Sequence, residues 1–255
     1  KARQYAREIV PSFSAFAYFG FGTRLARWIS NGLYDVRTAD GHDERLASLP
    51  KDATVIFVMN HRSNMDYVLI TYLAARRSAL SYAVGEWARV WPLSRLIRAM
   101  GAYFIRRKSR NDLYRKVLAA YMRLATQGGA TQAMFPEGGL SLDGALAEPK
   151  LGLLKYIVEA GDAYAEDPQG RDVLFVPVAL NYDRVLEDRI LMAQVPPEPV
   201  AFTRASVLLQ GFSLNNYGCV SAVAFIGLAM RQSALAHLFR YAHMQKNTVS
   251  RMRST

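Results

Sequence analysis

Short apolar runs alternate with helical patterns through the middle of this 255-residue chain. Residues 54–59 are apolar and β-branched, which favours a strand, and residues 66–75 follow with a helical pattern. The alternation continues with expected strands at 102–105, 131–135 and 173–180 and expected helices at 92–100, 111–127 and 151–164. Strands that alternate with helices predict an α/β fold, with a mixed, largely parallel sheet flanked by helices.

The clearest helix signal lies at 111–127. Asn111 can cap its first turn and Gly128 follows its last turn. In the expected strand at 173–180, Pro177 has no backbone N–H, so we expect an interruption there. The residues expected to share the buried face of the helix at 111–127 are Leu113, Val117, Leu118, Tyr121, Leu124 and Ala125.

The chain is basic, and its excess charge is unevenly distributed. It has 32 Lys and Arg against 21 Asp and Glu, a net charge of +11, and residues 89–116 hold nine basic residues and one acid. This excess implies an anionic partner: nucleic acid, a phosphorylated metabolite or an acidic membrane face. The sequence has no zinc-finger spacing, basic-leucine heptad or aromatic ribonucleoprotein motif, which disfavours nucleic acid. The single cysteine, Cys219, excludes an internal disulfide and a four-cysteine zinc site, and we expect no metal.

Residues 9–23 carry no charge; Arg3 and Arg7 precede them, and Arg24 and Arg27 follow them. These fifteen residues are fewer than the ~20 that a helix needs to cross a bilayer. We therefore expect an interfacial helix or a re-entrant hairpin at a membrane surface, with a core-packing helix as the alternative.

The sequence predicts three parts. Residues 1–45 are expected to form an N-terminal amphipathic or interfacial helical segment, and 46–230 the α/β domain. Residues 231–255 are expected to form a basic C-terminal helical segment, whose charges would meet anionic membrane headgroups or an acidic acyl donor. Within the second part, the apolar residues 219–225 predict a buried strand.

A polar segment with a histidine follows the first expected strand. His61 lies just past that strand, and Asp66 lies five residues later. Imidazole titrates near neutral pH and a carboxylate can orient its ring, so the two residues can act as a His–Asp general base. A five-residue offset places two groups about 140° apart on a helix, so the pair requires His61 in the loop and Asp66 in the first helical turn. Ser63 and Asp66 also fit a helix capping box, which is the structural alternative.

Arg106 and Arg107 follow the expected strand at 102–105. Guanidinium groups bind phosphate through paired hydrogen bonds, so this strand end is a candidate phosphate site. The alternative is a salt-bridged strand end.

A further turn, Pro-Glu-Gly-Gly, follows the expected strand at 131–135. Gly138 and Gly139 permit a close backbone approach or a positive φ, and Glu137 can accept hydrogen bonds from substrate hydroxyls. Lys150 begins the next helix, where an anion is favoured, and Arg184 follows the strand at 173–180. A turn of this composition alone is more often structural than functional.

Four sequence blocks, taken together and in this order, are more specific than any one of them: NHRSNMDY at 60–67, GAYFIRR at 101–107, FPEGG at 135–139 and VPVALNYDRVLED at 176–188. They resemble the glycerolipid acyltransferases with the HX4D motif, and most closely the bacterial glycerol-3-phosphate acyltransferases. The resemblance covers roughly residues 50–190. It implies an α/β acyltransferase domain with added membrane-contacting helices.

The resemblance implies that His61 is the general base and Asp66 its orienting partner. His61 would take the proton of the sn-1 hydroxyl of glycerol-3-phosphate, whose oxygen attacks the thioester of acyl-CoA or acyl-carrier protein, without a cofactor or an acyl-enzyme. Many relatives have arginine where this chain has Leu140, so phosphate binding is expected to depend more on other basic residues. The expected acceptor-binding residues are Arg106, Arg107, Glu137, Gly138, Gly139, Ser141, Lys150 and Arg184.

The expected function is that of an sn-glycerol-3-phosphate 1-O-acyltransferase, which makes lysophosphatidic acid in the first step of phospholipid synthesis. The alternatives are a 1-acylglycerol-3-phosphate or dihydroxyacetone-phosphate acyltransferase and, from another class, a non-catalytic basic membrane-binding protein. The expected partners are glycerol-3-phosphate, acyl-CoA or acyl-carrier protein, and an anionic phospholipid surface. The expected location is peripheral or monotopic, on the cytoplasmic face of the bacterial inner membrane.

Overall fold

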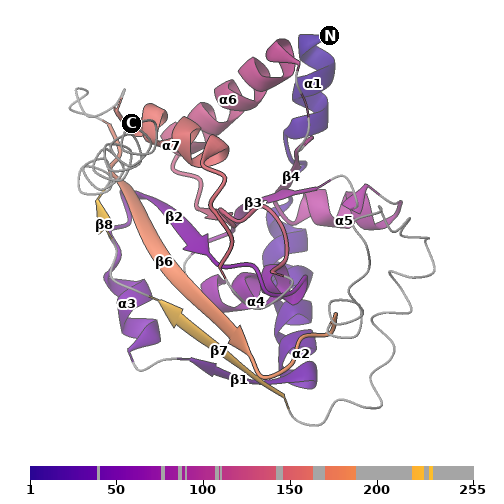
Figure 1. Cartoon of the computed structure of the whole chain (residues 1–255), viewed down its shortest axis with the longest axis vertical. Coiled ribbons are helices and arrows are strands. Elements are labelled where there is room, and N and C mark those ends of the chain that lie inside the picture. Colours follow the sequence, from indigo (N-terminus) through magenta and orange to yellow (C-terminus); the bar gives the residue numbers. More distant parts are fainter. Residues whose placement is uncertain are drawn as a thin grey trace, which may run out of the picture.

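The computed structural model describes residues 1–38, 41–75, 78–85, 88–89, 91–106, 109, 111–141, 146–162, 170–187, 220–226 and 230–231. Helices and strands alternate through this part of the chain (Figure 1). The helical elements are α1 (Ala2–Ile9), η1 (Phe16–Gly22, a π-helix), α2 (Thr23–Leu33), α3 (His42–Ser48), α4 (Met65–Ala74), α5 (Leu93–Ala99), α6 (Asp112–Gln127) and α7 (Gly152–Asp162). The strands are β1 (Tyr34–Thr38), β2 (Thr54–Met59), β3 (Ser81–Val84), β4 (Ala102–Phe104), β5 (Gln132–Met134), β6 (Val173–Tyr182), β7 (Val220–Ile226) and β8 (Met230–Arg231).

The strands form one eight-stranded sheet with the order β1-β7-β6-β2-β5-β3-β4, and β8 also pairs with β6. β2 pairs in parallel with β5 and β6, and β3 pairs in parallel with β4 and β5. β7 is antiparallel to β6 and parallel to β1, so the strand direction reverses at β7. The predicted mixed, largely parallel sheet is confirmed.

β2 lies in the middle of the sheet, and its side chains enter two cores on opposite faces. Val55 and Phe57 pack on the face that α4 covers, together with Ile70. Ile56 points the other way and packs with Met122 of α6 in a core that also includes α7. All five side chains are fully buried. Helices therefore cover both faces of the sheet, as expected for a strand with a nearly continuous apolar run.

The helix predicted at 111–127 forms as α6, and Asn111 caps it by accepting the N–H of Tyr114 at 3.0 Å. Its buried face is turned by about one residue from the expected one. Tyr114 is buried, whereas Leu113 and Leu124 are 40% and 63% exposed. Tyr114 packs against α1, where the ring of Tyr5 meets its ring edge-on at 5.4 Å, and Met122 packs in the core under β2.

β6 runs through Pro177 without the expected interruption. On one side Pro177 pairs with Val58 of β2. On the other side β8 pairs with residues up to Phe175 and β7 pairs with residues from Val178 onward. Pro177 lies between these two registers, where its missing N–H does not disturb a ladder.

Within residues 1–45, the helices α1, η1 and α2 extend to residue 33, and α3 begins at His42. Tyr34–Thr38, which we expected within a helical segment, form β1 and pair with β7. That part of the prediction was wrong because an edge strand depends on its partner, which lies far away in the sequence. None of the helices in the described ranges is both long and apolar enough to cross a membrane.

Toward the C-terminus, the predicted strand at 219–225 is confirmed as β7, one residue later. Of the predicted helical segment at 231–255, Arg231 lies in β8, and residues 232–255 lie outside the described part of the chain.

Candidate active site

Three parallel strands direct polar segments to the same edge of the sheet. β6, β2 and β5 lie side by side and run in one direction, so the segments that follow them start at a common edge (Figure 1). Asn60, directly after β2, joins two of these strands. Its side-chain amide donates to the carbonyl of Leu180 and accepts the N–H of Leu180, both at 2.7 Å.

His61 and Asp66 form a buried pair at this edge. His61 lies in the loop and Asp66 in the first turn of α4, with Nδ1 of His61 2.9 Å from Oδ2 of Asp66. Their side chains are 4% and 0% exposed. Because a carboxylate only accepts hydrogen bonds, Nδ1 carries the proton and Nε2 carries the lone pair. The structure thus brings the two residues together in the arrangement that the five-residue offset requires.

Asp66 also holds the start of α4. Its Oδ2 accepts the backbone N–H groups of Arg62 at 2.7 Å and Ser63 at 3.1 Å, and its Oδ1 accepts the hydroxyl of Tyr182 at 2.6 Å. The hydroxyl oxygen of Ser63 accepts the N–H of Met65 at 3.0 Å. The capping bonds and the contact with His61 therefore coexist on one carboxylate rather than compete for it.

Two aromatic rings fix the plane of the His61 imidazole. Phe135, which follows β5, stacks on it with a centroid distance of 4.2 Å and an interplanar angle of 27°. Tyr67, in the first turn of α4, meets it edge-on at 5.3 Å. These rings and the bond to Asp66 restrict the imidazole to one orientation.

Glu137 joins two segments of the site. Its Oε1 accepts the N–H of His61 at 3.0 Å, and its Oε2 accepts the N–H of Ala147 at 2.9 Å. The side chain is buried. Glu137 therefore holds the loop between β2 and α4 against the segment before α7. We call this loop, residues 60–64, the catalytic loop. The predicted contact of Glu137 with substrate stays a prediction.

The two glycines of the turn after β5 differ. Gly138 has a φ of +67°, and a Cβ there would lie 3.0 Å from Cδ of Lys150. Gly139 has an ordinary φ, and an added Cβ would meet open space. Lys150 is anchored beside this turn because its N–H donates to the carbonyl of Pro136 at 2.7 Å. The glycine requirement thus applies to Gly138 alone.

Ser141 completes the polar surroundings of the loop. Its N–H donates to the carbonyl of His61 at 2.9 Å, and its hydroxyl accepts Nη1 of Arg62 at 3.3 Å. The predicted site residues His61, Asp66, Glu137 and Ser141 are therefore joined by direct hydrogen bonds.

Arg106 is held by α1. Its Nε and Nη2 each donate to Glu8 at 2.7 Å, and its guanidinium lies over the ring of Tyr5. The hydrogen bonds from Arg106, together with those from Arg89, lower the pKa of the Glu8 carboxyl. The salt-bridged strand end, considered as the alternative, is thus present. Arg107 lies outside the described residues.

The segment after β6 contacts the catalytic loop through residues that sequence reasoning missed. Glu187 accepts the hydroxyl of Ser63 at 2.8 Å and both the N–H and Nδ2 of Asn64 at 2.9 Å. Tyr182 contacts Asp66, as described above. Arg184, between them, is exposed. The sequence block 176–188 contains Tyr182 and Glu187, but the sequence alone does not indicate that these two side chains contact the loop after β2.

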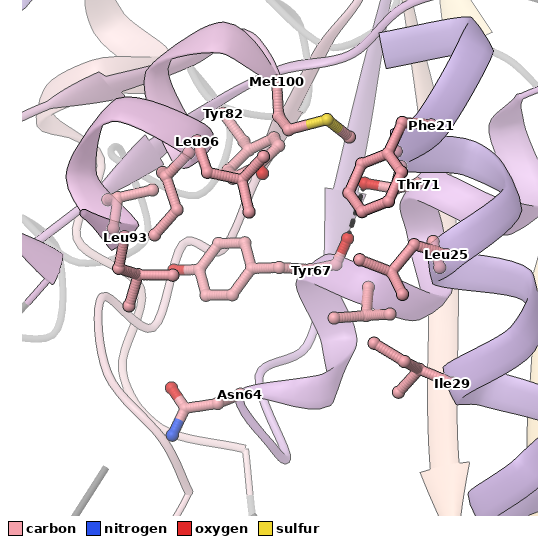
Figure 2. Close-up of a pocket in the computed structure, with 15 residues that line it drawn as sticks. Phe21, Leu25, Ile29, Asn64, Tyr67, Thr71, Tyr82, Leu93, Leu96 and Met100 are labelled. Carbon is pink, nitrogen blue, oxygen red and sulfur yellow. Dashed lines mark hydrogen bonds between the residues drawn. The ribbon is translucent and has the colours of Figure 1, made fainter. Parts of the chain in front are cut away.

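An apolar cavity of about 220 Å³ lies next to the catalytic loop, between η1, α2, α4 and α5 (Figure 2). Tyr67 lines this cavity and also contacts His61, so the cavity and the His–Asp pair share a wall. Sequence reasoning did not identify this cavity. Its other labelled lining residues in Figure 2 are Phe21, Leu25, Ile29, Asn64, Thr71, Tyr82, Leu93, Leu96 and Met100.

Known proteins share this sequence and architecture. A family model described as Acyltransferase matches residues 42–181. A glycerol-3-phosphate acyltransferase from Alteromonas mediterranea is 34% identical over 225 residues, which cover 85% of this chain and 26% of that protein. One from Pseudomonas paraeruginosa is 30% identical over 197 residues, covering 76% of this chain and 23% of that protein. The chain thus spans about a quarter of the length of these curated relatives.

The fold also occurs in the crystal structure of the 1-acyl-sn-glycerophosphate acyltransferase PlsC from Thermotoga maritima. The TM-score is 0.51 at 20% identity, covering 93% of this chain and 79% of that one.

The family model covers more than half of the chain, and the buried His–Asp pair at the carboxyl edge of the mixed sheet lies within the matched residues. The chain belongs to the acyltransferase family, and its curated relatives carry the name glycerol-3-phosphate acyltransferase. The family inferred from the four sequence blocks is confirmed.

Proposed function

We propose that this chain transfers an acyl group from a thioester to the sn-1 hydroxyl of glycerol-3-phosphate. The observation that carries the proposal is the hydrogen bond from Nδ1 of His61 to Asp66, because it leaves Nε2 as the basic nitrogen. The names of the curated relatives support the choice of acceptor.

In the proposed reaction, Nε2 of His61 removes the proton of the acceptor hydroxyl, and the oxygen attacks the thioester carbonyl carbon. The new C–O bond forms, the C–S bond breaks, and the departing thiolate takes the proton from His61. Asp66 stabilises the transient imidazolium. A positioned base contributes about 10²–10⁴-fold, so orienting the two substrates supplies much of the remaining rate. The proposed reaction uses neither a metal nor a cofactor.

We assign the acyl chain of the donor, acyl-CoA or acyl-carrier protein, to the apolar cavity. The cavity is lined almost entirely by apolar side chains, and Tyr67 connects it to His61. A fatty chain in this cavity would bring its thioester end toward the imidazole. Burial of the chain provides binding energy of about 0.8 kcal/mol for each CH₂ group.

We assign the phosphate of the acceptor to the basic residues after the strands. Lys150 lies against Gly138 in the turn that follows β5, and Arg184 belongs to the segment that contacts the catalytic loop. Arg106 and Arg107 are the further candidates, and Arg106 would bind phosphate in exchange for part of its contact with Glu8.

We further propose that the chain works at an anionic membrane surface, on the cytoplasmic face of the bacterial inner membrane. Phe16 and Trp28 are 87% and 75% exposed, and Phe21 is also exposed at the wall of the cavity. Arg24 and Arg27 lie close to them in the sequence and are exposed. Exposed aromatic rings beside basic side chains are typical of an interfacial surface.

A second candidate function is transfer to a lysophosphatidate acceptor, with dihydroxyacetone phosphate as a third acceptor. The named activity of the PlsC protein, which shares the fold, raises the lysophosphatidate reaction as a candidate. In that reaction the apolar cavity would hold the fatty chain of the acceptor instead of the donor chain.

An acceptor screen tests these alternatives. Glycerol-3-phosphate, lysophosphatidate and dihydroxyacetone phosphate are each incubated with one radiolabelled acyl-CoA and the protein, and lipid products are separated by chromatography. We expect labelled lysophosphatidate from glycerol-3-phosphate. His61→Ala and Asp66→Asn are the matched inactive controls. The screen is repeated with acyl-carrier protein as the donor, and product from none of the acceptors with either donor would support the non-catalytic alternative.

A further inference from the structure

Tyr182 lies where the end of β6 reaches the catalytic loop. Val178 of β6 pairs with Met59, the last residue of β2, and β6 continues to Tyr182. This extension beyond the end of β2 brings Tyr182 beside the loop between β2 and α4. Its hydroxyl donates to Oδ1 of Asp66 at 2.6 Å.

The two oxygens of Asp66 make separate contacts. Oδ2 receives the imidazole of His61 and two backbone N–H groups, whereas Oδ1 receives the hydroxyl of Tyr182. Asp66 is fully buried, so a hydrogen bond to its carboxylate has a larger electrostatic effect than it would in water. A second donor on the carboxylate disperses its negative charge and reduces its attraction for a protonated imidazole.

We infer that Tyr182 is a positioning residue: its hydroxyl fixes Asp66 and limits how strongly His61 holds a proton. The inference rests on the proposed role of His61 as the base. A base that returns its proton to a leaving group must not hold it too tightly, and Tyr182 provides that limit through Asp66.

Tyr182 remains a donor throughout the working pH range. Burial, and next the nearby Asp66 carboxylate, raise the pKa of the Tyr182 phenol far above its usual value. Its ring is held by an edge-on contact with Tyr34 of β1, at a centroid distance of 5.2 Å. The donor is therefore both protonated and oriented.

Four further residues in the described part of the chain place polar or charged groups near the pair through hydrogen bonds: Arg62, Glu137, Ser141 and Glu187. Glu137 contacts the backbone N–H of His61, and Glu187 contacts Ser63 and Asn64 in the same loop. Arg62 contributes its N–H to Asp66 and its guanidinium to Ser141. The two rings that contact the imidazole of His61, those of Phe135 and Tyr67, are uncharged. Tyr182→Phe leaves all these groups in place and removes one hydroxyl.

The test is an NMR titration of the histidine side chains in the full chain, which needs no substrate. The protein has four histidines, so the His61 signals are assigned by their loss in His61→Ala. In Tyr182→Phe we expect the His61 titration midpoint to move to higher pH by about 0.5–1 unit. Tyr121→Phe is the matched control, because it removes a phenol hydroxyl that contacts Ser81 at 3.3 Å, outside the catalytic loop. In this control the His61 titration midpoint should equal that of the wild type.

A second variant keeps the inference testable if Tyr182→Phe fails to fold. Difluorotyrosine at position 182 keeps the ring and the hydroxyl but is a stronger donor, so the His61 midpoint should move to lower pH. A midpoint that stays at the wild-type value in both variants overturns the inference.

Kinetics provides an independent readout. In Tyr182→Phe the acidic limb of kcat/KM should move to higher pH by the same amount as the titration, with the acceptor KM unchanged. Wild-type protein without transferase activity would contradict the proposed function and leave the titration result intact. An active Tyr182→Phe with a wild-type pH profile would contradict only the role of Tyr182.

Discussion

Glu137 and His61, 76 residues apart in the sequence, are joined by a 3.0 Å hydrogen bond from the backbone N–H of His61 to the carboxylate of Glu137. The same carboxylate accepts the N–H of Ala147. Glu137→Gln replaces one acceptor oxygen with an amide donor that would face a backbone N–H. We expect a loss of about 1–3 kcal/mol in the free energy of unfolding, measured by urea denaturation.

The control for this change is Glu159→Gln. Glu159 is an exposed carboxylate on α7, 3.5 Å from Lys155, and its loss should cost about 0.5 kcal/mol or less. Equal effects of the two changes would contradict a structural role for Glu137.

Gly138→Ala tests the turn after β5. The residue has a φ of +67°, and its new Cβ would approach Lys150 within 3.0 Å. We expect a loss of about 1–2 kcal/mol in stability from backbone strain, together with weaker acceptor binding if Lys150 is displaced. Gly139→Ala is the neighbouring control and should be close to wild type in both stability and KM, because its Cβ meets open space.

Gly22→Ala tests the assignment of the cavity to the acyl chain. The new Cβ would lie 2.1 Å from Cε of Met100, so the Met100 side chain must move, and the cavity that it lines would change shape. We expect a preference for shorter acyl chains, measured by competition between acyl-CoA donors of different length.

Gly22 is the last residue of η1, and Gly32→Ala, in the following helix α2, is the control for that experiment. Its Cβ has no neighbour within 4 Å, so chain preference should stay as in the wild type. An unchanged preference in Gly22→Ala would place the acyl chain elsewhere.

Glu8→Gln tests how α1 is held on the domain. The pKa of Glu8 is lowered, chiefly by the hydrogen bonds from Arg106, so the folded state favours the ionised carboxylate. Its contribution to stability is therefore complete above the ordinary value of 4.5 and is lost as the pH falls through the lowered value. We expect Glu8→Gln to be less stable than wild type by about 0.5–1 kcal/mol at pH 7, since Arg106 is 40% exposed.

The difference between Glu8→Gln and wild type should narrow below about pH 4. A difference that does not narrow at any pH below 4.5, the ordinary pKa of this carboxyl, would show that the ion pair does not hold α1.

Arg106→Ala separates phosphate binding from docking of α1. A role in phosphate binding predicts at least a tenfold rise in the KM for glycerol-3-phosphate, since hydrogen bonds to charged groups contribute about 1.5–3 kcal/mol. Lower stability with an unchanged KM would limit Arg106 to its contact with Glu8. Arg115→Ala, which removes an exposed partner of Asp112 on α6, is the charge-matched control.

The central strands and the His–Asp pair could be predicted from the sequence because the information is local. The apolar run of β2, the polar loop after it and the first turn of α4 follow one another within thirteen residues, 54–66. The five-residue offset restricts the pair to one arrangement, which the structure contains. The turn after β5 is likewise predictable, because its Pro-Glu-Gly-Gly residues are consecutive in the sequence.

The remaining features depend on contacts between distant segments. β1 is a strand because β7 pairs with it, and Tyr114 of α6 is buried in contact with Tyr5 of α1. Arg106 appears in the sequence as a cation after a strand, and its partner Glu8 lies on another element. The same holds for Tyr182, whose role is visible only once β6 lies beside β2.

Asp66 couples the proposed base to the start of α4. Its carboxylate receives the N–H groups of Arg62 and Ser63 before α4 and the imidazole of His61 together. Any event that frays the first turn of α4 therefore also disorients the base. Catalysis should disappear at lower denaturant concentrations than the signals of the buried sheet, so that turnover itself reports the earliest local opening of the molecule.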